Sequence, residues 1–244
     1  MPAETMRPEA ELQVVRKPLP HDSAPRHVTG TAAYIDDIRE PSGTLHLAPG
    51  YAPIASGRII SVDLSAVRAA PGVVTVLTGE DIPGANDISP KQIGDDPALA
   101  TDEVRFHGQV VFAVVAKTRD AARRAAKKAK FVTEAATPII DVAEATDKVL
   151  ADYAFVQGDP DAAVAAAPVS FEDEFRIGGQ EHFYLEGQIS LAIPGEAGEI
   201  LVHASTQHPS EVQHVVAHAL HVPSSAVTVE IRRMGGGFGG KESQ

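Results

Sequence analysis

The 244-residue sequence contains no cysteine. The chain therefore has no disulfide framework and no thiolates that could hold an iron–sulfur cluster. Positive charge is also scarce, because 21 lysines and arginines face 33 aspartates and glutamates, and the net charge of −12 argues against nucleic acid or an anionic membrane as a partner. No apolar run approaches the roughly 18 residues of a membrane-spanning helix, and residues 1–12 lack the apolar core of a signal peptide. These absences favour a cytoplasmic protein.

The rest of the composition is that of an ordinary globular protein, with 43% hydrophobic and 22% charged residues. The length is sufficient for one large domain or two ordinary ones. Residues 1–20 contain four prolines and scattered charges, which predicts a flexible N-terminal tail.

Residues 21–141 alternate between strand and helix patterns, which predicts an α/β domain. The predicted strands are residues 31–38, 45–48, 58–62, 73–77, 108–116 and 131–133. The predicted helices are residues 65–70 and 119–130, and Thr118 is the expected cap of the second. That helix has a strongly basic face, but no aromatic residues alternate with its charges, which favours a solvated surface over a nucleic-acid site.

Residues 142–168 are rich in alanine and aspartate and predict a linker. Residues 169–244 then predict a second segment of mixed α and β structure. Its predicted strands are residues 169–176, 189–193, 200–204 and 226–231, and its predicted helix is residues 211–220, capped by Ser210. We expect the first segment to be self-contained and the second to be an incomplete domain with exposed strand edges.

The most unusual stretch is the glycine-rich sequence of residues 232–242, which follows the last predicted strand. Glycine at this density excludes a helix or strand interior and lets a loop approach an anion or a cofactor closely. A dinucleotide-binding loop would need a following helix and an acidic residue about 20 residues further on, and both positions lie beyond residue 244. A phosphate-binding P-loop would need serine or threonine where Glu242 stands, and a glycine-rich turn without a ligand remains an alternative.

Two further clusters of polar residues could carry chemistry. Residues 178–186 and 205–208 place carboxylates, amides and histidines after a turn and at the end of a strand, where α/β proteins often put their sites. A third group, His214, His218 and His221, shares one helix face at a spacing that suits metal ligands. That helix lacks the glutamate of a zinc protease, which favours hydrogen-bonded histidines on a half-buried face.

Four of these motifs resemble the molybdenum-binding subunit of the xanthine dehydrogenase family. They are Thr-Gly-Thr-Ala-Ala-Tyr-Ile-Asp-Asp at 29–37, Gly-Gly-Gln-Glu-His-Phe-Tyr-Leu-Glu at 178–186, Ser-Thr-Gln-His-Pro-Ser at 205–210 and Arg-Arg-Met-Gly-Gly-Gly-Phe-Gly-Gly-Lys-Glu at 232–242. They occur in the family's order from about residue 17 onward. The resemblance implies that residues 21–141 form the family's α/β hammerhead domain and that residues 169–244 begin its molybdopterin-binding domain.

The resemblance also implies a set of cofactor-binding residues. Gln207 is expected to bond an oxo ligand of molybdenum, and the backbone N–H groups of Phe238 and Gly239 are expected to face the metal's apical oxygen. Gly236, Gly237 and Gly240 would allow the close approach of the loop. Gln180 is expected to lie near the pterin. Neutral donors suit this role because they stabilise a metal oxo group without a competing proton.

The implied reaction is the hydroxylation of hypoxanthine and xanthine to urate at molybdenum. Electrons would leave through 2Fe-2S clusters and FAD to NAD, and the absence of cysteine places those clusters on a partner chain. The family's subunit continues well beyond the glycine-rich loop, so no catalytic base is assigned here. We expect a partner that supplies the remaining C-terminal molybdenum domain, and we expect the chain alone to be inactive, whether it is a fragment, a nicked chain or one product of a split gene. An aldehyde- or carbon monoxide-type molybdenum hydroxylase and a non-catalytic assembly module are the alternatives.

Glu242 is the expected substrate-binding residue. In the family, this position faces the substrate and is a glutamate in purine enzymes. A carboxyl group can bond to the N–H and carbonyl groups of a purine edge, whereas a simple aldehyde offers no such partners. The alternative is that Glu242 pairs with Lys241 or Arg233 at the surface.

Overall fold

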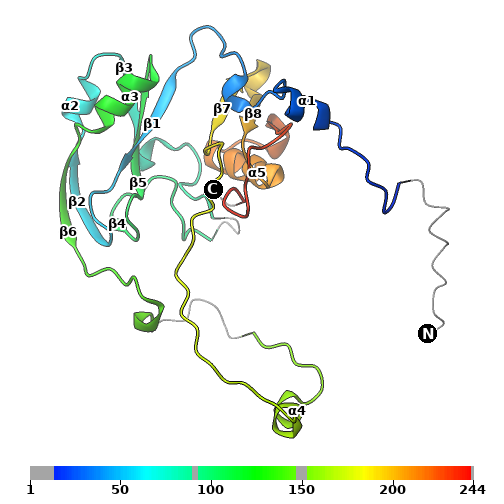
Figure 1. Ribbon diagram of the computed structural model, residues 1–244. Helices are drawn as coiled ribbons and strands as arrows, with labels where there is room; N and C mark the ends of the chain where they lie inside the picture. The colour runs from blue at the N-terminus through cyan, green and yellow to red at the C-terminus, as the bar shows by residue number, and fades with distance from the viewer. Residues whose placement is uncertain (1–13, 90–92, 147–152, 243–244) are drawn as a thin grey trace.

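Three three-stranded sheets form the frame of the molecule in this computed structural model, which describes residues 14–89, 93–146 and 153–242. Two sheets lie in the N-terminal part of the chain and one lies in the C-terminal part (Figure 1). Most of the predicted N-terminal tail, residues 1–13, lies outside the described residues. The predicted mixed α and β class is confirmed.

The first sheet places its most apolar strand in the centre. Strand β5 (Val110–Ala116) pairs antiparallel with β1 (His46–Tyr51) on one side and with β3 (Val73–Leu77) on the other. Helices α2 (Ser65–Arg68) and α3 (Arg119–Ala126) pack beside it (Figure 1). The side chain of Thr118 caps α3 by accepting the Ala121 N–H at 3.1 Å, as the sequence predicts.

The second sheet completes the N-terminal unit, with the order β4 (Glu103–Val104), β2 (Gly57–Asp63) and β6 (Lys130–Ala135). The core lies between these elements and centres on Phe112, which is fully buried. The Phe112 ring lies against Gly50, where an added Cβ would fall 2.1 Å from the ring. Glycine at position 50 is therefore a packing requirement.

The third sheet belongs to the C-terminal unit. Strand β8 (Ile200–Ala204) pairs antiparallel with β7 (Ser190–Pro194) and parallel with β9 (Val227–Glu230). Helix α5 (Pro209–Leu220) makes the crossover that a parallel pair needs, and it covers a small core at Val202, Ala204, Ala217 and Val227. The cap of α5 is His208 rather than the predicted Ser210, because Pro209 begins the helix two residues earlier than predicted.

Short helical turns connect the larger elements. They are α1 (Ala24–Thr29), η2 (Ile35–Asp37), η3 (Gly79–Asp81), η4 (Val142–Glu144), α4 (Pro160–Ala166), η5 (Glu196–Gly198) and η6 (Ser224–Ala226). The stretch around α4 loops away from the sheets in Figure 1. None of the helices in the described part of the chain combines the length and the apolarity needed to cross a membrane.

Two predicted strands are wrong. Residues 31–38 contain the turn η2 instead, because the Asp37 carboxylate accepts the Tyr34 N–H at 2.9 Å and closes a local turn. Residues 169–176 are not a strand, although their apolar residues alternate; Phe171 is 94% exposed and Phe175 is 82% exposed. An extended segment becomes a strand only when a neighbour accepts its hydrogen bonds, and no described strand does so here.

The two units touch through a backbone clasp at the end of α5. The Gly84 N–H donates to the Ala219 carbonyl at 2.8 Å, and the Ala85 N–H donates to the His218 carbonyl at 3.4 Å. An added Cβ at Gly84 would fall 2.1 Å from the His218 oxygen, so only glycine allows this approach. The clasp joins the N-terminal unit to the helix that leads into the site.

Candidate functional site

The glycine-rich loop begins where β9 ends and folds back on itself. The Gly240 N–H donates to the Gly237 carbonyl at 2.8 Å, which closes a tight turn. Gly236, Phe238 and Gly239 have positive φ angles of 102°, 54° and 91°. Phe238 is the only one of the three with a side chain, and that side chain is 74% exposed. The loop therefore presents backbone and one aromatic ring at the surface.

Gln207 lies against this loop from the end of β8. Its Oε1 accepts the N–H of Gly239 at 2.8 Å and the N–H of Lys241 at 3.3 Å. Its own N–H donates to the Lys241 carbonyl at 2.7 Å. A Cβ at Gly237 would fall 2.6 Å from Oε1, so glycine makes room for this contact.

The orientation of the Gln207 amide follows from these contacts. Because Oε1 accepts two backbone N–H groups, Nε2 is the end that faces away from the loop. The residue is exposed, and within the described ranges Nε2 has no hydrogen-bond partner. Gln207 therefore offers two neutral N–H donors beside the loop.

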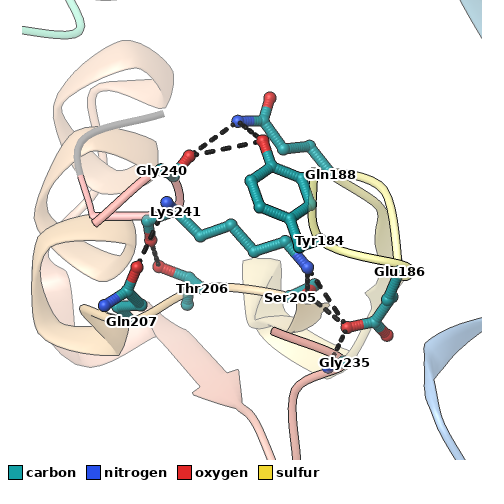
Figure 2. A network of polar contacts seen from close by, with 9 residues as sticks. All are labelled: Tyr184, Glu186, Gln188, Ser205, Thr206, Gln207, Gly235, Gly240 and Lys241. Atoms are coloured by element: carbon teal, nitrogen blue, oxygen red, sulfur yellow. Dashed lines mark hydrogen bonds and ion pairs between the residues drawn. The ribbon is translucent and has the colours of Figure 1, made fainter. Parts of the chain in front are cut away.

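A buried polar network supports the loop from beneath (Figure 2). Lys241 is fully buried, with Nζ 2.7 Å from the Ser205 hydroxyl and 3.3 Å from Oε2 of Glu186. The same Oε2 accepts the Ser205 hydroxyl at 2.6 Å and the Gly235 N–H at 2.8 Å. The Lys241 ammonium also lies 4.6 Å from the centre of the Tyr184 ring.

These contacts determine the protonation of Glu186. Burial would raise its pKa, but hydrogen bonds from the Gly235 N–H, Ser205 and Lys241 outweigh burial and hold the pKa below its ordinary value. Oε1 of Glu186 is buried and makes no hydrogen bond to the described residues. The ionised form of Glu186 is therefore stabilised by the hydrogen bonds that one of its two oxygens, Oε2, accepts.

Residues 184–188 also hold the end of the loop. The Gly240 carbonyl accepts Nε2 of Gln188 at 3.0 Å, and the Tyr184 hydroxyl lies 3.5 Å away (Figure 2). Added Cβ atoms at Gly240 would meet Tyr184 at 2.8 Å and His182 at 3.0 Å. The loop and the 182–188 stretch are therefore packed face to face, although more than 50 residues separate them in sequence.

The structure brings most of the predicted site residues together. Gln207 and residues 236–240 form one cluster, as described above. The Gly239 N–H donates to Gln207 in this arrangement, so of the two predicted backbone donors Phe238 is the one whose N–H has no partner within the described ranges. Gln180 is exposed and stands apart, since the neighbouring Gly179 has nothing within 4 Å of an added Cβ. The residues of that motif that contact the loop are His182, Tyr184 and Glu186.

Glu242 lines a cavity of about 300 Å³ next to the site. The cavity lies between β7, β8 and α5, and its walls include Ile189, Val212 and Val216. The surface pairing considered for Glu242 is contradicted, because Lys241 pairs with Glu186 and Arg233 donates to the Ala33 carbonyl at 2.6 Å and to the Ser23 hydroxyl at 3.3 Å. The Glu242 carboxylate is exposed at the rim.

The histidines of α5 do not form a metal cluster with other residues. Within the described ranges, no group of three or more histidine, cysteine, aspartate or glutamate side chains could hold a metal ion. His218 instead accepts the Ala85 N–H at its backbone carbonyl as part of the clasp. His208 caps α5 by accepting the Glu211 N–H at Nδ1, 3.0 Å away.

Sequence reasoning missed the pairing of Lys241 with Glu186. Both residues lie within the motifs that the sequence singles out, but 55 positions separate them. The available signal was the combination of a lysine at the end of a glycine loop with a second carboxylate in an otherwise aromatic and polar stretch. Neither residue alone indicates a buried ion pair.

The loop fits an organic cofactor in its chemistry. Glycines at 237 and 240 let the side chains of Gln207 and Tyr184 pack directly against the loop backbone, and the loop leaves the Phe238 N–H and the Gln207 amide as donors. Donors of this kind suit oxygen atoms bound to a metal or in a cofactor.

Comparison with protein families divides the chain into two matched regions. Residues 29–136 match the model for the aldehyde oxidase and xanthine dehydrogenase a/b hammerhead domain. Residues 142–244 match the model for the molybdopterin cofactor-binding domain. Together these matches include the sheets, the loop and the polar network described above.

Comparison with individual proteins gives the same picture. The chain is 41% identical to aldehyde oxidase 2 of Rattus norvegicus over 93% of its own length, and 40% identical to xanthine dehydrogenase of Blastobotrys adeninivorans over 96%. It spans 17% of the length of each. Among solved structures, aldehyde oxidoreductase from Desulfovibrio gigas superposes on 90% of this chain and 27% of its own with a TM-score of 0.78 and 27% identity.

Proposed function

Because the chain belongs to the aldehyde oxidase and xanthine dehydrogenase family, we propose that it is part of the molybdenum-binding subunit of a hydroxylase that oxidises purines. Residues 21–141 are the hammerhead domain, residues 142–168 are a linker, and residues 169–244 begin the molybdopterin-binding domain. The remaining C-terminal part of that domain comes from further polypeptide. The 2Fe-2S clusters lie outside these 244 residues, because the sequence has no cysteine, and FAD is assigned to the same partner chain.

The observation that carries the proposal is the contact between Gln207 and the glycine-rich loop. Oε1 of Gln207 is held by two backbone N–H groups, which turns the Nε2 donors outward. Gln207 and the Phe238 N–H would hold the molybdenum–molybdopterin cofactor, with Gly236, Gly237, Gly239 and Gly240 keeping the backbone close and Gln180 nearer the pterin. When bound, the cofactor supplies the two-electron oxidation that no side chain can provide.

The residues of this chain contribute binding and orientation. Donors held by backbone contacts keep their direction while substrate binds, so they need no reorganisation during the reaction. Glu242, at the rim of the 300 Å³ cavity, would accept or donate hydrogen bonds at the edge of a purine and fix which carbon faces the cofactor. The catalytic base is assigned to polypeptide outside this chain.

Replacing Gln207 tests the cofactor assignment. In the assembled enzyme, Gln207→Ala is expected to lower kcat by about a hundredfold or more, which is the cost of removing one oriented donor, while the protein still assembles. Molybdenum analysis and xanthine turnover are the measurements, and Gln213→Ala, a glutamine on α5 that bonds the Val227 carbonyl, is the matched control. Unchanged turnover and molybdenum content in Gln207→Ala would remove the assignment. A wild-type assembly without molybdenum would favour a non-catalytic module.

An aldehyde-oxidising enzyme is the second candidate, favoured by the 41% identity to aldehyde oxidase 2. Replacing Glu242 distinguishes the two. Glu242→Ala is expected to lower kcat/KM for xanthine by about 1–3 kcal/mol of transition-state binding, because a polar partner is left unpaired. Turnover of an apolar aldehyde should change less. Equal losses for both substrates, or no loss for either, would contradict the purine assignment.

A further inference from the structure

Both ends of the glycine-rich loop converge on one carboxylate. Oε2 of Glu186 accepts the N–H of Gly235, the first glycine of the loop, at 2.8 Å. The same atom lies 3.3 Å from Nζ of Lys241, the residue that closes the loop. One oxygen atom therefore fixes the separation between the two ends of the turn (Figure 2).

The side chain and the backbone of Lys241 contact different groups. Its ammonium group points into the protein toward Glu186 and the Ser205 hydroxyl. Its backbone faces Gln207, since the Lys241 N–H donates to Oε1 of Gln207 at 3.3 Å and the Lys241 carbonyl accepts the Gln207 N–H at 2.7 Å. Lys241 therefore joins the buried ion pair to the backbone groups that hold Gln207.

The burial of these groups makes the arrangement specific. Lys241 has no exposed surface, and the Glu186 side chain is 9% exposed. A buried charge is destabilising unless it is paired and hydrogen-bonded, so the ammonium has few alternative positions. Ser205, which bonds both partners, and the Tyr184 ring complete the surroundings of the ammonium group.

We propose that Glu186 and Lys241 are positioning residues that set the geometry of the glycine-rich loop and, through the Lys241 backbone, the orientation of the Gln207 amide. The part of this inference that concerns cofactor retention rests on the proposed function. The part that concerns the loop does not, because it depends only on contacts within the chain.

The decisive experiment compares three variants by hydrogen–deuterium exchange and by molybdenum content of the assembled enzyme. Lys241→Met removes the ammonium and leaves Glu186 unpaired. Lys241→Arg keeps a positive charge. The double variant Glu186→Gln with Lys241→Met removes both charges. Lys128→Met makes the same substitution at an exposed lysine and is the control.

In Lys241→Met, amide exchange in peptides covering residues 235–241 is expected to rise by about a hundredfold, with loss of most bound molybdenum. Lys241→Arg should restore part of the protection of the loop against exchange and part of the bound molybdenum. The double variant should recover thermal stability, because no uncompensated charge remains, while the loop still exchanges rapidly. Lys128→Met should match the wild type.

The result that overturns the proposal is a double variant whose loop is protected as in the wild type, since the pair would then serve only to balance charge. Unchanged loop exchange in Lys241→Met would overturn it as well. If Lys241→Met fails to fold, the double variant alone decides between these outcomes. A wild-type assembly that shows a protected loop without molybdenum would contradict the proposed function, and the loop exchange of the variants would still decide the positioning role.

Discussion

The two units of the chain are held together by different physical means. In the N-terminal unit, fourteen of the described residues form one buried hydrophobic cluster around Phe112. In the C-terminal unit, the corresponding cluster has four such residues, and the largest fully buried side chain among its described residues is a lysine, Lys241. The first unit relies on the burial of apolar surface, and the second relies on a network of charges and hydrogen bonds.

This difference matters for function because the network lies directly under the candidate site. Apolar contacts are non-directional, so a hydrophobic core tolerates small shifts of its side chains. Hydrogen bonds and a buried ion pair require particular distances and angles, so the network allows one arrangement of the loop and of Gln207. The positions of the loop and of Gln207 thus depend on this network more than on the small core of the C-terminal unit.

The largest effect is expected from truncating the core of the N-terminal unit. Phe112→Ala should lower its free energy of unfolding by about 3–5 kcal/mol, because the lost ring leaves a cavity next to Gly50. Denaturant unfolding is the measurement. Phe106→Ala, at a phenylalanine that is 55% exposed, should change the free energy by no more than about 0.5 kcal/mol. Similar losses in the two variants would show that the N-terminal unit does not depend on this core.

The next effect is a dependence on acid that is specific to the C-terminal unit. Burial raises the pKa of Glu186, but the Gly235 N–H, Ser205 and Lys241 lower it further than burial raises it, so the folded pKa lies below the ordinary value of 4.5. A lowered folded pKa means that the stabilisation is complete above about pH 4.5 and is lost as the pH falls through the folded value.

The protection of peptides 235–241 against exchange, after correction for the intrinsic rate, should therefore decrease as the pH falls below about 4.5. The carboxylates of Asp63 and Asp81 in the N-terminal unit also have lowered pKa values, because Ser65 and Thr78 respectively bond to them, so acid will weaken both units. The variant Glu186→Gln isolates the part of the acid response that arises in the C-terminal unit. After correction for the intrinsic rate, the loop exchange of this variant should vary less with pH than that of the wild type. Identical pH profiles would contradict the assignment of the acid response to Glu186.

How much of this could be predicted from the sequence depends on how local each feature is. The run of apolar residues at 108–116 predicts β5 within two residues, and Thr118 predicts the start of α3, because both depend on neighbouring residues. The glycine-rich loop and Gln207 were also recognisable as parts of motifs. The buried pair of Lys241 and Glu186 was not, because only the folded chain brings residues 55 positions apart together.

The two wrong strand predictions have the same origin. An alternating pattern indicates which side chains could share a face, but a strand also needs a partner at the right distance. In residues 31–38, the Tyr34 N–H donates to the nearby Asp37 carboxylate instead of to a neighbouring strand. Residues 169–176 have none among the described strands, so their apolar side chains remain exposed.

A smaller effect on stability, with a larger effect on the site, is expected at the loop. Gly237→Ala places a methyl group 2.6 Å from Oε1 of Gln207 and should lower stability by about 1–3 kcal/mol. Because Gln207 must move, we also expect a loss in kcat of about a hundredfold in the assembled enzyme. Gly178→Ala, where an added Cβ meets nothing within 4 Å, is the control. Normal exchange and activity in Gly237→Ala would show that Gln207 does not need its observed position.

The smallest effect is expected from removing a helix cap in the N-terminal unit. In the N-terminal unit, the Thr118 hydroxyl accepts the Ala121 N–H, so Thr118→Ala leaves one donor of α3 unsatisfied and should cost about 1 kcal/mol. Thr118→Ser keeps the hydroxyl and should restore most of the loss. Thermal unfolding followed by hydrogen exchange should place this change in peptides of the N-terminal unit, while peptides 235–241 keep their wild-type rates. If the loop also exchanges faster in Thr118→Ala, the clasp between Gly84 and α5 transmits stability between the units, and the division into an apolar unit and a polar unit is incomplete.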